Sequence, residues 1–155
     1  MPKRPSDATT FDELASAMRE LVPRLRADVN KVSQEVAKRL VFRLINETPV
    51  DTSAALSNWQ LRVSRVTGAV LPPYSAGSKG STAGTSSTAA YAAAVGAVTA
   101  KKPTQHVINI FNNIPHIDEL NAGKSKQASA GFVQNIVATS DADAKVQLRT
   151  LLNGY

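Results

Sequence analysis

Gly123, Lys124 and Ser125 spell the Gly-Lys-Ser sequence with which a nucleotide-binding phosphate loop ends. Such a loop also needs a glycine five positions before its Gly-Lys pair, and it must join a strand to a helix so that successive amides surround phosphate. Here that position holds Asp118, an acid that would repel phosphate, and the residues around it read as a helix or turn. We therefore predict that Gly123 is a turn residue at a helix end, with Lys124 and Lys126 exposed.

His116, Asp118 and Glu119 form the other group whose types could bind a metal or move a proton. The chain has two histidines, His106 and His116, and neither stands in a His-x-x-x-His or His-Glu-x-x-His arrangement. There is no Gly-x-Ser-x-Gly elbow and no cysteine. We expect no catalytic residue, no metal and no cofactor, hence no enzyme; nucleotide handling that depends on Lys124 is the last-ranked alternative.

Basic side chains recur along one long helical segment, interspersed with acids, and the residues concerned are Lys31, Lys38, Arg39, Arg43, Glu35 and Glu47. The mixed charge predicts a solvated face, and duplex contact by a small DNA-binding regulator is the alternative. Trp59, the only tryptophan, lacks neighbouring aromatics at strand spacing. It is therefore expected to anchor a core rather than to stack on bases.

Length and composition limit the setting of these residues. A chain of 155 residues is most economically a single domain, and 18 basic against 12 acidic residues give a net charge of +6. The absence of cysteine fits a cytosolic setting. No apolar run follows the basic start and no stretch of 18 apolar residues occurs, so we expect neither a secretory signal nor a membrane span.

The N-terminal third has the pattern of a long amphipathic helix. Thr10 and Glu13 have capping-box spacing, and residues 1–9 before them are expected to be a flexible arm. One apolar stripe then follows at helical steps: Leu14, Met18, Leu21, Leu25, Val29, Val32, Val36 and Leu40. Because Pro23 removes a backbone donor, we predict a break there, with helices at about 11–22 and 24–46, or a kink.

The middle of the chain changes period. Asp51 is placed to cap a short helical turn through the amide of Ala54. Trp59, Leu61 and Val63 then alternate with polar residues at 60, 62 and 64, which predicts a half-buried strand. Residues 71–87 are rich in Pro, Gly, Ser and Thr and predict a long surface loop, of the kind that a partner often orders, and a short alanine-rich helix follows.

The last third supplies a second strand and short helices. The β-branched run at 105–113 predicts the strand. Helices are expected at about 116–120, 130–138 and 141–152, the last capped by Ser140. The predicted fold class is α+β, with one domain over 10–155: a long N-terminal helix packed on a small, mainly antiparallel sheet, short C-terminal helices, and a long Gly/Ser/Thr-rich loop.

Two blocks of sequence resemble a known family. "TPVDTSAALSNW", residues 48–59, resembles the PVDTGxLrxSW element of phage tail-completion and neck proteins, which include the lambda-type minor tail protein Z group. "INIFNNIPHIDELNAGKSKQASAGFV", residues 108–133, resembles the second element of the same family, and the two occur in the family's order. The matching positions are Pro49, Val50, Asp51, Thr52, Leu56, Trp59, Asn112, Asn113, Gly123, Ser125, Lys126, Gln127, Ala130, Gly131 and Phe132.

Departures from the family pattern are few. Ser53 replaces the usual glycine, His116 an aromatic residue and Ser129 a proline, while Asn121 and Ala122 stand near the usual Glu-Tyr-Gly. They bear on local turn geometry.

The resemblance implies a structural virion protein that forms a sixfold or twelvefold homo-oligomeric ring at the head-to-tail junction of a tailed phage. Its implied neighbours are connector or head-completion proteins on one side and tail tube or terminator proteins on the other. DNA would pass through the lumen without sequence reading, which suits a basic chain. The expected location is the virion neck after assembly in the host cytoplasm, and a tail terminator is the alternative.

Overall fold

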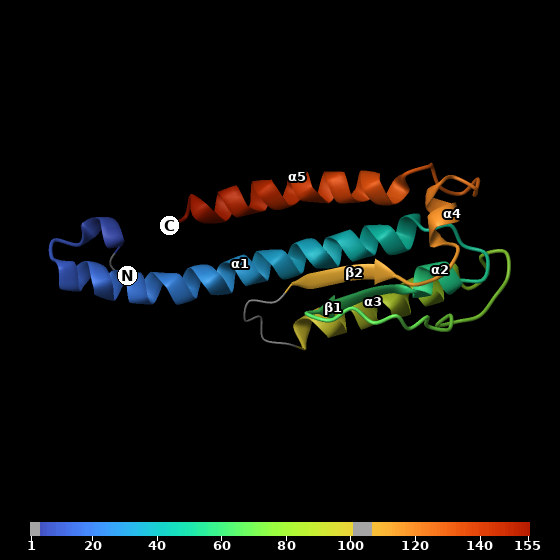
Figure 1. The fold of residues 1–155 in the computed structure, drawn as a ribbon, viewed down its shortest axis with the longest axis horizontal. Helices are drawn as coiled ribbons and strands as arrows, with labels where there is room; N and C mark the ends of the chain where they lie inside the picture. The colour runs from blue at the N-terminus through green and yellow to red at the C-terminus, as the bar shows by residue number, and fades with distance from the viewer. Residues whose placement is uncertain (1–3, 101–106) are drawn as a thin grey trace.

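The computed structural model describes residues 4–100 and 107–155 and has the predicted α+β class (Figure 1). A two-stranded antiparallel sheet is surrounded by helices, and the elements in chain order are η1 (Pro5–Asp7), α1 (Phe11–Glu47), α2 (Ala54–Ser57), β1 (Trp59–Val63), α3 (Ala83–Thr99), β2 (Ile108–Asn112), α4 (Ile117–Asn121) and α5 (Phe132–Leu152).

Helix α1 runs unbroken through Pro23, so the predicted break is wrong. Its start is as predicted: the Thr10 hydroxyl accepts from the Glu13 amide, and the Glu13 carboxylate accepts from the amide of Thr9. Proline lacks only one donor and fits helical φ, so tertiary packing on both sides of the position can hold the helix continuous. The described part of the N-terminal arm contains the η1 turn, which packs on α1.

The sheet pairs β1 with β2, with Trp59 opposite Asn112 and Val63 opposite Ile108. Trp59, Leu61 and Val63 are buried as predicted, but Gln60, expected to face solvent, is also buried at 4% exposure. It is covered because residues 67–71 cross the second face of the sheet. Strand β2 spans Ile108–Asn112, so residues 107 and 113 of the predicted run lie outside it, and residues 105–106 lie outside the described part of the chain.

The core lies where the C-terminal half of α1, α3 and the sheet meet. Val41 and Ile45 of α1, Leu61 of β1 and Val98 of α3 are each at most 1% exposed. Phe132 and Ile136 close this core from α5. Burying such side chains stabilises the fold by roughly 1.5–3 kcal/mol each, so the sheet is held mainly by the helices rather than by its own pairing.

Helix α3 is longer than the predicted short helix, since it begins at Ala83 and passes through Gly96. The predicted loop over 71–87 therefore ends at residue 82. The face of α3 that meets the core carries small side chains, Ser86, Ala90 and Ala94. These let the helix approach the sheet closely, and that packing is what extends it into the Gly/Ser/Thr-rich stretch.

Helix α5 is one helix of 21 residues, which corrects the prediction of two. Ser140, expected to cap the second, lies inside the helix and is 7% exposed. The helix packs along α1, and its end is latched by Tyr155, whose hydroxyl hydrogen-bonds to the Asp28 carboxylate while its ring lies under Arg24. This hydrogen bond raises the pKa of Tyr155.

Candidate functional site

The two blocks of family-like sequence meet in space through Gln127. Its side-chain oxygen accepts from the Val50 amide at 2.8 Å, and its side-chain nitrogen donates to the Val50 carbonyl at 3.2 Å. The amide thus pairs with the backbone in both directions, as a neighbouring strand would. Residues 77 positions apart are joined here, so we call this contact the motif junction.

Asp51 extends the motif junction to the loop before α3. Its carboxylate accepts from the Lys79 amide at 2.7 Å, and its carbonyl accepts from the Gly80 amide at 2.9 Å. The predicted cap of α2 by Asp51 is therefore wrong. Ser53 takes the N-cap position instead, with a left-handed φ of 65°, and its hydroxyl shares a hydrogen bond with Thr82. Glycine adopts such a φ at less cost than serine does.

Thr48 and Trp59 form the buried part of the first block. The indole nitrogen of Trp59 donates to the Thr48 hydroxyl at 2.7 Å, and that hydroxyl donates to the Leu44 carbonyl at 2.6 Å. Trp59 is thus a core anchor, as predicted, and its polar edge is satisfied. Pro49 and Leu56 are also buried, so this block holds the end of α1 to the sheet.

The asparagines of the second block bind backbone. Asn112 donates to the Ala55 carbonyl at 2.8 Å, which ties β2 to α2. Asn113 donates to the carbonyls of Thr67 and Ala69 and so holds the crossing segment over the sheet.

Two polar residues that the sequence did not single out help to hold that segment. Asn58 exchanges two hydrogen bonds with the backbone of Leu71, and Gln60 donates to Ala69. Neither residue carries a spacing signal that predicts a contact with residues 69–71.

The Gly-Lys-Ser sequence forms a turn between α4 and α5, as predicted. Gly123 has a φ of 84°, and a Cβ there would lie 2.9 Å from the Ala130 Cβ. Gly131, with a φ of 74°, starts α5 and donates to the Asn121 carbonyl at 2.7 Å. Phe132 then enters the core at 2% exposure. These glycines bring two chain segments together closely.

The remaining predicted positions are on the surface. Thr52, Lys124 and Lys126 are exposed, and Lys124 pairs with Glu119 at 3.3 Å. Ser125 is half-buried and accepts from the Gln127 amide at 3.2 Å, which fixes the turn before Gln127. The Glu119 carboxylate beside Lys124 would repel phosphate.

A cleft of about 290 Å³ borders the motif junction and includes His116, Asp51 and Gln127 among its lining residues. Within residues 4–100 and 107–155, no group of three or more His, Cys, Asp or Glu side chains is close enough to hold a metal ion. Asp51, Ser125 and Gln127 at the cleft bond to backbone, and the Ser53 hydroxyl bonds to that of Thr82. These hydrogen bonds fix chain geometry.

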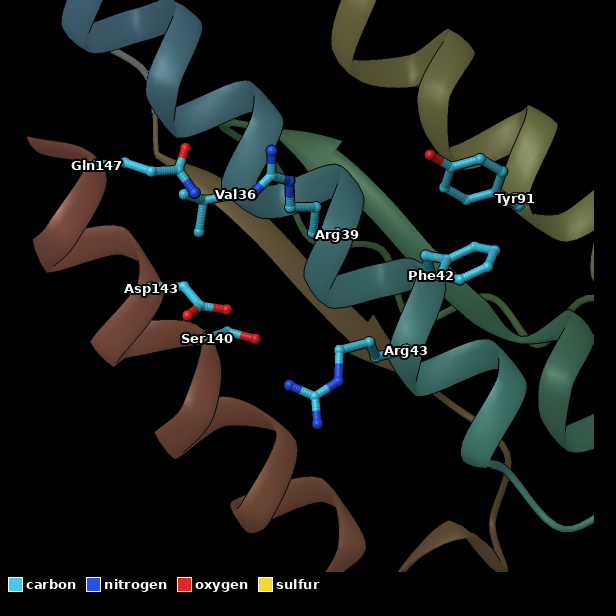
Figure 2. A pocket seen from close by; sticks show the side chains of 8 residues that line it. All are labelled: Val36, Arg39, Phe42, Arg43, Tyr91, Ser140, Asp143 and Gln147. Carbon is cyan, nitrogen blue, oxygen red and sulfur yellow. The ribbon is translucent and has the colours of Figure 1, made fainter. Parts of the chain in front are cut away.

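A second cavity, of about 340 Å³, lies between α1 and α5 and holds the predicted basic residues Arg39 and Arg43 (Figure 2). Ser140, Asp143 and Gln147 line its α5 wall, facing the two arginines. Arg43 also pairs with Glu47 at 3.6 Å. These two arginines therefore face a neighbouring helix across a gap.

Lys38 and Glu35 are paired on α1 at 2.8 Å. The hydrogen bond from Lys38 holds the pKa of the Glu35 carboxyl below its usual value. Together with the Arg43–Glu47 pair, this agrees with the predicted mixed-charge surface of α1.

Comparison with models of known families, with curated proteins and with solved structures finds no significant match. Among the described residues, no helix combines the length and the apolar character needed to cross a lipid bilayer.

Proposed function

We propose that this chain is a structural subunit of a tailed-phage virion, which forms a ring at the head-to-tail junction as a neck or tail-completion protein. The observation that carries the proposal is the motif junction. Val50 and Gln127 were identified by the resemblance alone. The side-chain oxygen and nitrogen of Gln127 both hydrogen-bond to the backbone of Val50. Two blocks that resemble one family thus form one structural unit.

The chemistry of these residues supports a role in shaping a subunit. Gln127, Asn112 and Asp51 each bond to backbone, and Trp59 bonds to a buried threonine. Groups used in this way set the positions of loops and helix ends. A ring subunit needs such fixed surfaces because each contact is repeated around the symmetry axis.

The basic balance of the chain fits a ring that DNA crosses. The net charge of +6 attracts phosphate without reading bases, and such attraction weakens as salt rises. A lumen of this kind needs weak, sequence-independent contact, because tight binding would hold the genome in place.

Immunogold electron microscopy of purified virions tests the proposal, with antibody raised against this chain. Label at the joint between head and tail is the expected result, and particles that carry none would overturn the proposal. Disrupting the gene should give normal-length tails that fail to join heads. Overlong tails would assign the subunit to tail termination instead.

A further inference from the structure

The N-terminal end of α1 packs on the η1 turn and also carries exposed apolar side chains. Helix α5 packs along α1 and is latched to it at Asp28, whereas Phe11–Val22, here called the α1 tip, extends past the end of α5 (Figure 1). The apolar stripe continues there with exposed side chains: Phe11 is 83% exposed, Met18 44% and Leu14 40%. This spacing is that of a helix whose anchors enter a groove.

A matching groove lies further along the same molecule. It has a volume of about 340 Å³ and is walled by Ile108 and Ile110 of β2 and by Ala144 and Leu148 of α5. Its floor is the α1 stripe at residues 32–40, so mainly aliphatic side chains line it. A water molecule takes about 30 Å³ in the liquid, so the groove has room for whole apolar side chains.

The tip cannot fill the groove of its own chain. Both belong to one continuous helix, and the ten residues from Val22 to Val32 separate them by roughly 15 Å along its axis. A tip that fills this groove must therefore belong to another copy of the chain.

Charge favours contact between a tip and the α1 of a neighbouring copy over contact between two tips. The tip carries the acids Asp12, Glu13 and Glu20 and one base, Arg19. The side chains that line the groove are uncharged, and the rest of α1, which includes the groove floor, has six basic and three acidic residues. Two tips would repel each other, whereas a tip and a neighbour's α1 attract, with a range of about 8–10 Å at moderate salt.

We propose that the α1 tip of one copy docks in the groove between α1, α5 and β2 of the next copy. This contact is heterologous, because a different surface is used on each side, and such contacts generate rings when the rotation closes. The inference deepens the proposed function, since it names the contact between neighbouring subunits of the ring.

Disulfide trapping tests this contact in a chain that has no native cysteine. Met18→Cys protein is mixed with Leu148→Cys protein under mild oxidation, and the mixed disulfide is measured on non-reducing gels. The matched control is Val146→Cys, on the same helix, 62% exposed and outside the groove lining. We expect at least about tenfold more mixed disulfide with residue 148 than with residue 146, because a disulfide needs Cβ atoms about 4 Å apart.

Three results would overturn the inference: equal trapping at positions 146 and 148, a Met18→Cys homodimer as the main product, or no trapping at any concentration. A second measurement uses the double variant Leu14→Asp, Met18→Asp, whose side chains are exposed, so that folding is retained. Its dissociation constant for self-association in sedimentation should rise at least about tenfold, while Val146→Asp leaves it unchanged. Equal effects would also overturn the inference.

The two proposals fail in different ways. Trapping at Leu148 together with absence from virions would remove the phage function and keep the contact. Label at the head-to-tail joint without trapping would keep the function and remove the contact.

Discussion

At the scale of single residues, Thr48 joins the end of α1 to the first strand. Replacing it with valine keeps the shape of the side chain but removes the acceptor of the Trp59 N–H. Thr48 is only 3% exposed, so the donor is left unpaired in a buried site. An unpaired buried donor costs about 1–3 kcal/mol. We expect Thr48→Val to lower the free energy of unfolding by that amount, as measured by urea unfolding followed by circular dichroism.

The control for this prediction is Thr48→Ser, which retains the hydroxyl and loses one methyl group. Burial of such a group is worth about 0.8 kcal/mol, so the serine variant should be less destabilised than the valine variant. If both lose equal stability, the methyl contact and not the hydrogen bond holds the two elements together.

Gly123 gives a second prediction at this scale. Its left-handed φ and the close Ala130 Cβ leave no room for a side chain, so Gly123→Ala should cost at least about 1–2 kcal/mol of folding free energy. Gly68 is the control, because a Cβ there meets nothing within 4 Å. Gly68→Ala should change stability by less than about 1 kcal/mol. Similar losses in both variants would contradict this assignment.

The residue types predicted part of the site, but they did not predict which groups hydrogen-bond to one another. Sequence spacing indicated that Asp118 does not fit a phosphate loop and that Gly123 lies in a turn. Both predictions concern residues that are close in sequence. Asp51 shows the limit: its side chain can accept from several nearby amides, and the one chosen belongs to Lys79. Only the fold decides that this bond, between residues 28 positions apart, forms in place of the local bond to Ala54.

At the scale of elements, Pro23 leaves α1 continuous but removes the donor for the Arg19 carbonyl. Because the tip lies beyond α5, it should open locally without unfolding the core. Pro23→Ala adds a hydrogen bond and up to about 3 kcal/mol of helix propensity. We expect amide hydrogen exchange over residues 11–22 to slow by about tenfold or more, with little change in the core.

Ser16→Ala is the matched control in the same exposed helix. It adds only about 0.5 kcal/mol of propensity, so exchange should slow by roughly two- to threefold. If Pro23→Ala slows exchange no more than this, the proline is not what limits the stability of the tip.

The elements that the sequence predicted well are those with a strong period. The stripe from Leu14 to Leu40 indicated the long helix, and alternation indicated β1. Helix ends in small-residue regions were wrong, because Ala83 and Ser140 favour several conformations by their local propensity. Packing against the sheet and against α1 extends the helices there, and local sequence does not predict that packing.

At the scale of the whole molecule, long-range order comes from a few side-chain amides that act like backbone. Gln127, Asn113 and Asn58 each hold a segment that lies outside the helices and strands. The sheet has only two strands, so these amides and the surrounding helices replace the ladder that a larger sheet would provide. The resulting body has fixed loops and one projecting helix.

The charge of the whole molecule gives the last prediction. A lumen protein should bind DNA through phosphate alone, so the isolated subunit should bind two unrelated duplexes of equal length with similar dissociation constants, about 10⁻⁶–10⁻⁴ M at physiological salt. Fluorescence anisotropy over a salt series measures both affinity and slope.

The double variant Arg39→Ala, Arg43→Ala separates this behaviour from that of a DNA-binding regulator. Both side chains face α5 across a cavity, and Arg43 pairs with Glu47, so their loss should leave the salt slope nearly unchanged. A preference of more than about tenfold for one duplex would show base-reading contact, whereas a slope flattened by about two would show that Arg39 and Arg43 contact phosphate, as a regulator that binds through α1 requires. A sequence preference would contradict a passive channel wall, because a site that prefers one sequence would retard DNA during passage.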